Sequence, residues 1–394
     1  FFIMIYIYVS RGTLFVFCYF CYENNKPIIV TPCNPDKLSL DLMDKIADIL
    51  RIIDKIDKIG IYGPGANQVC LGDYSGPFGG WRGEGAVNAY QGIKKAFEGK
   101  ADVVLNQTGQ DVNPLAQSCD ILLFFPAIME DEGSDRSSFK LPSQHVNQNR
   151  EDINNQIIDE QQKLNLAIDQ ERMIRDLIAT GKPVVVVLQN GSVIDITDWV
   201  DGTAAVLEAW YPGEQGGTAI ADVLTGKYNP GGRLPFSWVK SIGQNPMYYS
   251  VKPSGRNYSY VENDGKPLYP FGYGLSYTTF EYGNFEMPEA LDKDNALKLS
   301  VTVTNTGKVA GDEVVQVYMH DEIASVGRPL KELVAFKRVT LNPGESKKVE
   351  IEVPYRSFHM WDKDMKFRVE EGWFSVWLGK NAEEVIKSRR VYVK

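Results

Sequence analysis

Residues 119–125 read CDILLFF, an almost continuous apolar run with the length of one β-strand. Such a run is typical of a strand that is buried on both faces, as in a parallel sheet that helices cover. Residues 184–188 read VVVVL and have the same character. Further short strands are predicted at Lys58–Tyr62, Ala101–Leu105 and Ala204–Ala209.

Segments with helical periodicity separate these strands. Apolar residues recur three and four positions apart within 42–53, 86–97 and 168–178. Ser39 is placed to begin the first of these helices, and Gly181 is placed to close the last. Because strands and helices alternate, we predict a three-layer α/β sandwich with a mostly parallel sheet flanked by helices.

The periodicity changes after Phe280. Residues 297–303 and 349–353 alternate strictly between apolar and polar, as in strands with one buried and one solvated face. Turn sequences follow or precede them, at Asn305-Thr306-Gly307 and Asn342-Pro343-Gly344. Short strands with turns and no helices predict an all-β sandwich.

A chain of 394 residues is too long for one ordinary core. The patterns divide it into four parts. These are an apolar N-terminal segment at 1–37, the α/β domain at 38–245, a linker or junction at 246–282, and the β-sandwich at 283–394.

Residues 1–22 are apolar and aromatic, like a membrane segment or the core of a signal peptide, but Arg11 and Gly12 divide them into two short halves. The chain also begins with Phe. We favour an incomplete or mistranslated amino terminus over a signal peptide or a membrane anchor, and we expect no membrane partner. Residues 22–35 are predicted to be a polar connector.

The formal charge of −9 argues against a nucleic-acid partner, because no basic cluster is present that would neutralise a run of phosphates. Cys18 and Cys21 form a Cys-x-x-Cys pair, but no second pair follows, so we predict neither a metal site nor a redox site. The sequence does not specify the compartment, although a secreted or extracytoplasmic location is favoured.

An acidic loop, MEDEGSDR at 129–136, follows the strand at 121–125. Ligands of open α/β sheets gather beyond the carboxyl ends of the strands, so carboxylates at this place are candidates for acid–base chemistry. A solvated acidic turn is the alternative that composition alone supports.

The sequences of several segments resemble those of glycoside hydrolase family 3. Residues 132–136 (EGSDR), followed by Leu141-Pro142, are similar to the Glu-Gly-x-Asp-Arg…Leu-Pro segment of that family. Residues 63–75, 207–235 and 270–280 resemble other parts of its C-terminal α/β domain, and the residues around Val303–Gly307 and Arg328–Leu333 resemble its fibronectin type III-like domain. The resemblance covers roughly Leu38 to Lys394.

The resemblance implies a role for particular residues. Glu132 is the candidate general acid/base of a retaining glycosidase, and Glu130 is its rival two positions away. Tyr74 and Trp81 are candidate substrate-binding residues with flat apolar faces for a sugar ring, and Asp73 is the third. The alternative for the two aromatic residues is that they cover the domain's own core or an adjoining domain.

In that family the nucleophile is an Asp on a (β/α)₈ barrel that precedes these domains. Such a barrel needs about 250 residues, and fewer than 60 precede Lys58. We therefore interpret the chain as the C-terminal part of a retaining, exo-acting β-glycosidase, and among these enzymes we favour a β-glucosidase. The chain lacks the barrel and is expected to be inactive alone. Its expected partners are a β-linked oligosaccharide or glycoside and the missing barrel, with no cofactor. The alternative is a non-catalytic module that binds carbohydrate or another protein.

Overall fold

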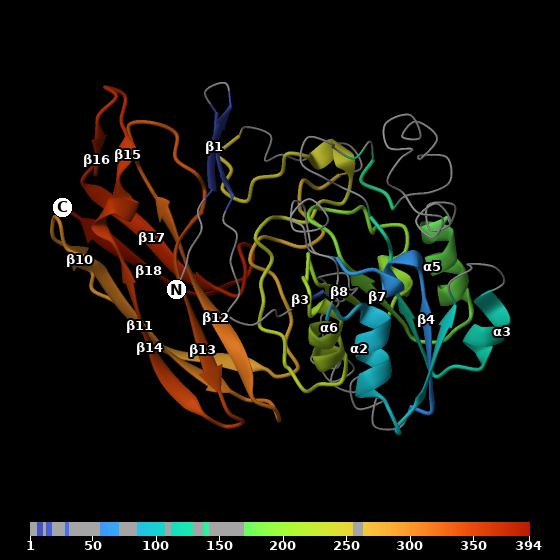
Figure 1. Ribbon diagram of the computed structural model, residues 1–394. Coiled ribbons are helices and arrows are strands. Elements are labelled where there is room, and N and C mark those ends of the chain that lie inside the picture. The colour runs from blue at the N-terminus through green and yellow to red at the C-terminus, as the bar shows by residue number, and fades with distance from the viewer. Residues whose placement is uncertain are drawn as a thin grey trace.

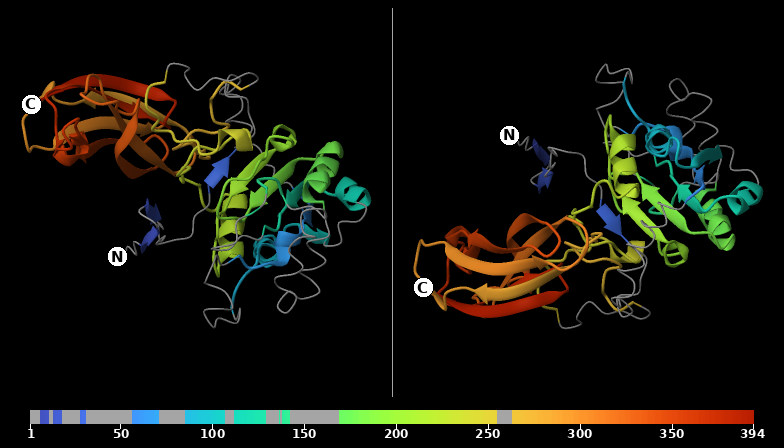
Figure 2. Two further views of the ribbon diagram at one scale, coloured as in Figure 1. Left: turned by 90° about the horizontal axis from the view of Figure 1, so that it is seen from above. Right: turned by 90° about the horizontal axis from the view of Figure 1, so that it is seen from below.

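A computed structural model of the chain describes residues 6–10, 13–17, 28–30, 56–70, 85–106, 112–128, 136, 138–141, 169–254 and 263–394. Two parts lie side by side, an α/β domain and an all-β domain, as Figure 1 and both views of Figure 2 show. Both domain types agree with the architecture that the sequence predicts.

Among the described residues, six strands form one sheet in the order β3-β8-β7-β6-β4-β5. Their bounds are Ile28–Val30 (β3), Lys58–Tyr62 (β4), Asp102–Asn106 (β5), Ile121–Phe124 (β6), Val184–Leu188 (β7) and Ala205–Glu208 (β8). Strands β5, β4, β6, β7 and β8 run parallel, and β3 pairs antiparallel with β8 at the edge. The prediction of a mostly parallel sheet is confirmed.

Helices cover both faces of this sheet (Figure 1). Successive strand residues point to opposite faces, so Leu122 and Val186 join one core while Leu123 and Val187 join the other. The first core also contains side chains of α3 (Val112–Gln117) and α5 (Gln170–Ala179), and the second contains side chains of α2 (Ala89–Ala96) and α6 (Gly216–Leu224). Each fully buried Leu, Ile or Val contributes about 1.5–3 kcal/mol relative to an exposed one.

Two of the three predicted helices lie in the described part of the chain, and both begin at a side-chain cap. Asn88 precedes α2 and accepts a hydrogen bond from the Gln91 amide at 2.9 Å, while Gln91 accepts one from the Asn88 amide. Asp169 caps α5 through the Arg172 amide. The helix predicted at 42–53 lies outside the described residues.

Helices α2 and α6 approach each other closely enough for their backbones to touch. A Cβ atom on Gly92 would lie 2.0 Å from the carbonyl oxygen of Gly217, and a Cβ atom on Gly217 would lie 1.9 Å from that of Asn88. The Gly217 amide donates to the Val87 carbonyl at 2.8 Å. Only glycine fits at this crossing, since any side chain would push the helices apart.

Gly217→Ala is therefore expected to lower the free energy of unfolding by about 1–3 kcal/mol, the usual cost of forcing extra volume into a packed contact. Urea unfolding followed by circular dichroism measures the change. Gly372→Ala is the matched control, because a Cβ atom there meets nothing within 4 Å. Equal unfolding midpoints for the two variants would contradict the close packing.

The all-β domain is a sandwich of two sheets, ordered β10-β18-β17-β12-β13 and β14-β11-β9, with a shared core between them. Its strands are Phe280–Glu286 (β9), Ala290–Leu291 (β10), Leu297–Asn305 (β11), Gly311–Asp321 (β12), Glu332–Leu341 (β13), Ser346–Val353 (β14), Gly372–Gly379 (β17) and Val385–Val393 (β18), and a small hairpin pairs Met360–Trp361 (β15) with Phe367–Arg368 (β16). The predicted sandwich is confirmed.

The N-terminal segment contributes strands as well. Tyr6–Ser10 (β1) pairs antiparallel with Thr13–Phe17 (β2), so the two apolar halves lie beside each other on either side of residues 11–12. Three residues of the predicted polar connector form β3, because the apolar triplet 28–30 pairs with the open edge of β8. Within the described residues, no helix has both the length and the apolar character needed to cross a membrane.

Buried polar side chains join the two domains. Arg233, after α6, donates from Nη2 to Glu313 Oε2 on β12 at 2.7 Å, and Tyr282 donates to Glu313 Oε1 at 2.6 Å. Asn229 donates to the Ala310 carbonyl and accepts from the Tyr277 amide. The side chains of Arg233 and Glu313 are only 11% and 4% exposed, so this ion pair is shielded from water.

Candidate active-site loop and its anchors

The predicted acidic loop leaves the sheet at the carboxyl end of β6, where the chain continues as Phe125-Pro126-Ala127. This stretch packs against the turn after β4. The Gly65 amide donates to the Phe125 carbonyl at 2.9 Å, and a Cβ atom on Gly63 or on Gly65 would lie 2.3 Å from a carbonyl oxygen of this stretch. The glycines of the turn thus allow two backbones to touch, which is a structural role.

Gln170 holds the start of the loop. Its amide accepts from the Ala127 N–H at 2.8 Å and donates to the Ala127 carbonyl at 2.9 Å. The side chain is 1% exposed, at the first position of α5. A side-chain amide that satisfies both backbone groups of one residue acts like a neighbouring strand and fixes the direction in which the chain leaves β6.

Arg136 holds the far end of the loop. Its guanidinium Nη2 donates to Ser192 Oγ at 2.7 Å and to the Val193 carbonyl at 2.6 Å, in the segment after β7. These two contacts attach Arg136 to the segment that follows β7, the strand next to β6 in the sheet.

Residues 138–141 are also attached to α5 and to the segment after β7. The Asp195 amide donates to the Phe139 carbonyl at 2.8 Å, and the Leu141 amide donates to Glu171 Oε1 at 3.2 Å. Burial raises the pKa of the Glu171 carboxyl, opposed by the Lys140 ammonium nearby. Lys140 also hydrogen-bonds Asp198 and thereby lowers the pKa of that carboxyl.

Aromatic residues line the neighbouring exit of β8. The Trp210 ring lies edge-on to the Phe236 ring at 5.5 Å, and the Phe236 ring lies 5.9 Å from that of Trp238. Trp210 has φ +53°, an uncommon conformation for a non-glycine residue, and its amide donates to Glu208 Oε1 at 2.8 Å. Glu208 is fully buried and serves as a structural acceptor.

The five predicted site residues, Glu130, Glu132, Asp73, Tyr74 and Trp81, lie outside the described residues.

The ends of the segment 71–84 are nevertheless placed. The Cys70 carbonyl accepts from the Gly213 amide at 3.0 Å, and the Gly85 carbonyl accepts from Gln215 Nε2 at 3.0 Å. Residues 213 and 215 follow β8, so both candidate loops begin and end near the carboxyl edge of one sheet.

Sequence reasoning missed the anchors Gln170, Ser192 and Gln215. Each is a common polar residue whose importance depends on a partner far along the chain, and nothing in its local sequence marks it. In the part of the chain that the structure describes, no three His, Cys, Asp or Glu residues come together as a metal site would require.

The described residues form a two-domain chain: an α/β sandwich with anchored loop ends at the carboxyl edge of its sheet, followed by a β-sandwich. A family model for the glycosyl hydrolase family 3 C-terminal domain matches residues 47–277, and one for a fibronectin type III-like domain matches residues 313–382. The chain therefore belongs to glycosyl hydrolase family 3, of which it contains the C-terminal domain and the fibronectin type III-like domain.

Similarity to named proteins supports this membership. The chain is 42% identical over 238 residues to a periplasmic β-glucosidase of Salmonella typhimurium, covering 57% of this chain and 31% of the relative. It is 35% identical over 344 residues to a β-xylosidase of Formosa agariphila, covering 84% and 45%. A crystal structure of a β-glucosidase from Listeria innocua in complex with glucose matches with a TM-score of 0.74 at 27% identity, covering 93% of this chain and 48% of that one. The chain thus spans less than half the length of these relatives.

Proposed function

We propose that the chain is the C-terminal part of a retaining, exo-acting β-glycosidase that hydrolyses terminal β-D-glycosidic bonds, with β-glucosides as the foremost substrate class. Glu132 donates the proton to the leaving oxygen and later activates water, and Glu130 is the second candidate for this role. The nucleophile comes from a barrel domain outside this chain. In this proposal the α/β domain takes residues 38–245, residues 246–282 form the junction, and the β-sandwich takes 283–394.

The observation that carries the proposal is the double anchoring of the acidic loop. Gln170 fixes Ala127 at one end and Arg136 binds Ser192 at the other, so the loop is attached at the edge of the sheet where ligands of open α/β folds collect. A retaining glycosidase needs two carboxyl groups about 5–5.5 Å apart, which demands a proton donor on a well-anchored segment. The curated relatives with this domain are named β-glucosidases and β-xylosidases.

Asp73, Tyr74 and Trp81 supply the sugar contacts in this proposal. Their segment begins at Cys70 and ends at Gly85, each bonded to the chain after β8. An aromatic ring packs against the apolar face of a sugar and leaves the hydroxyl edge free to hydrogen-bond. These residues therefore bind substrate beside the acid/base loop.

The test is to join the chain to the barrel of a family relative. We expect this 394-residue chain alone to hydrolyse no cellobiose and the joined protein to release glucose from it. The relative's own C-terminal half on the same barrel is the positive control. Turnover by the chain alone would show that the nucleophile lies within it. A folded joined protein without turnover would contradict the proposed function.

A further inference from the structure

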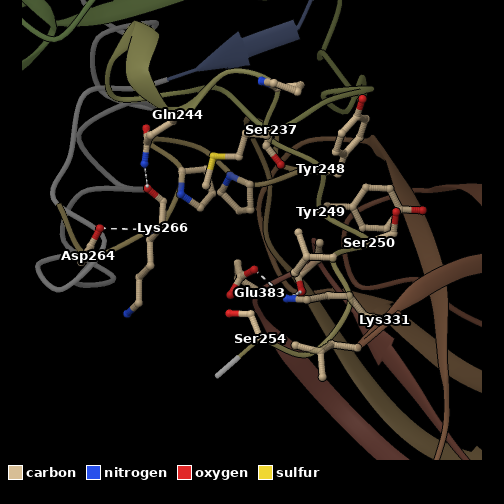
Figure 3. Close-up of a pocket in the computed structure, with 18 of the residues that line it drawn as sticks. Ser237, Gln244, Tyr248, Tyr249, Ser250, Ser254, Asp264, Lys266, Lys331 and Glu383 are labelled. Atoms are coloured by element: carbon tan, nitrogen blue, oxygen red, sulfur yellow. Dashed lines mark hydrogen bonds and ion pairs between the residues drawn. The ribbon is translucent and has the colours of Figure 1, made fainter. Parts of the chain in front are cut away.

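A large open cavity lies between the junction segment and the β-sandwich (Figure 3). Its volume is about 1270 Å³. One wall carries Tyr248, Tyr249 and Ser250, and Gln244 and Lys266 face them from the other side. Small-molecule sites usually measure about 300–1,000 Å³, so this cavity has room for a ligand of several linked rings.

Hydrogen bonds between the two domains fix the walls. The Leu330 amide donates to the Val251 carbonyl at 2.8 Å, and the Leu333 amide donates to the Tyr249 hydroxyl at 3.2 Å. The Tyr249 ring stacks on Phe271 at 3.9 Å. Since the segment that carries Tyr248, Tyr249 and Ser250 is bonded to the β-sandwich, this side of the cavity is a built feature of the domain junction rather than a loosely placed loop.

The cavity offers hydroxyl groups and an exposed ring. Tyr248 is 68% exposed, and within the described chain neither its hydroxyl nor that of Ser250 has a hydrogen-bond partner. The Ser254 hydroxyl is buried in the cavity wall and likewise lacks a partner there.

The charges of the lining carboxylates are already compensated. Glu383 binds the Lys331 ammonium at 2.6 Å, and Asp264 binds that of Lys240 at 2.9 Å. Neither carboxylate therefore attracts a cation. The lining offers a ligand hydroxyls, which both donate and accept, the ammonium groups of Lys252 and Lys266, which donate, and a flat ring with a polar tip.

We propose that this cavity binds a neutral oligosaccharide, with the Tyr248 ring against one sugar face and the Ser250 hydroxyl bonded to a sugar hydroxyl. Sugar hydroxyls have the same dual donor and acceptor character as the serines, and sugar rings present the apolar C–H faces that pack on tyrosine. None of the residues that anchor the acidic loop lines the cavity. The site goes beyond the proposed hydrolysis and does not depend on it.

Calorimetric titration of the 394-residue chain with cellotetraose tests the site. We expect saturable binding with a dissociation constant of about 1 mM or tighter, weakened at least about tenfold by Tyr248→Ala. Ser250→Ala is expected to weaken it about threefold to tenfold, as the loss of one hydrogen bond does. Both changes are at a cavity surface, and unchanged melting temperatures confirm that the fold is intact.

Ile242→Ala is the matched control, since Ile242 is six positions away, is 63% exposed and is absent from the lining. It should leave the affinity unchanged. Absence of saturation at about 10 mM cellotetraose overturns the proposal. So does an affinity that Tyr248→Ala leaves intact. Loss of binding in Glu132→Gln instead would place the sugar at the acidic loop, and would support the hydrolase while removing the cavity site.

Discussion

Glu132→Gln, in the chain joined to a family barrel, should lower the turnover of cellobiose about 10²–10⁴-fold, the usual contribution of a general acid/base. Glutamine keeps the shape of the side chain but has no proton to give to the leaving oxygen. A dinitrophenyl β-glucoside has a leaving group that needs no proton, so formation of its glycosyl-enzyme should be slowed far less. The burst of dinitrophenolate in the first turnover measures formation of the glycosyl-enzyme, and its rate is compared with the initial rate on cellobiose.

Glu130→Gln is the matched control for that experiment. It removes the same type of charge two positions away in the same acidic loop, and we expect turnover of cellobiose to stay within about threefold of the parent protein. If the large loss instead follows Glu130→Gln, the acid/base is Glu130. If neither change distinguishes the two substrates, the proton donor lies elsewhere in the protein.

Arg233→Met is expected to lower the free energy of unfolding by about 3–5 kcal/mol, because it leaves the Glu313 carboxylate buried without its positive partner. Glu313 is 4% exposed, so water cannot replace the guanidinium. Burial and the negative Glu313 nearby raise the pKa of the Tyr282 hydroxyl, which therefore stays protonated as a donor but carries no compensating charge. Urea unfolding monitored by tryptophan fluorescence gives the change.

Two comparisons isolate the effect of burial. Lys227→Met breaks an exposed pair with Asp222, 73% and 31% exposed, and should cost no more than about 1 kcal/mol. Adding Glu313→Gln to Arg233→Met removes the stranded charge and should recover part of the loss. Equal losses for Arg233→Met and Lys227→Met would show that the interdomain pair is not a structural determinant.

Much of the α/β core follows from local sequence. Strands β4 and β7 have the bounds that the apolar runs at 58–62 and 184–188 predict, since a strand buried on both faces leaves a continuous apolar signature. Helices α3 and α6 were not predicted from periodicity. The first is six residues long and contains Pro114, and the second begins with Gly216-Gly217, so both depend on tertiary packing rather than on helix propensity.

The sequence predicts the residues of the candidate site less completely than it predicts the residues of the core. The resemblance picks out Glu132, but the residues that hold its loop are remote: Gln170 lies 43 positions from Ala127, and Ser192 lies 56 positions from Arg136. Polar side chains of this kind acquire a role only when the fold brings a backbone group to them. The same holds for Arg233, which lies in the stretch 207–235 that carries the family resemblance and whose side chain joins the two domains.

The hydrogen bonds across the domain junction also affect how quickly a ligand enters and leaves the cavity. Because Leu330 and Leu333 of the β-sandwich are hydrogen-bonded to Val251 and Tyr249, and Arg233 is paired with Glu313 across the same domain junction, no hinge has to open before a molecule enters the cavity. Entry through an already open mouth proceeds as a single encounter with no slow rearrangement. Residence time at this junction is then set by the contacts inside the cavity alone.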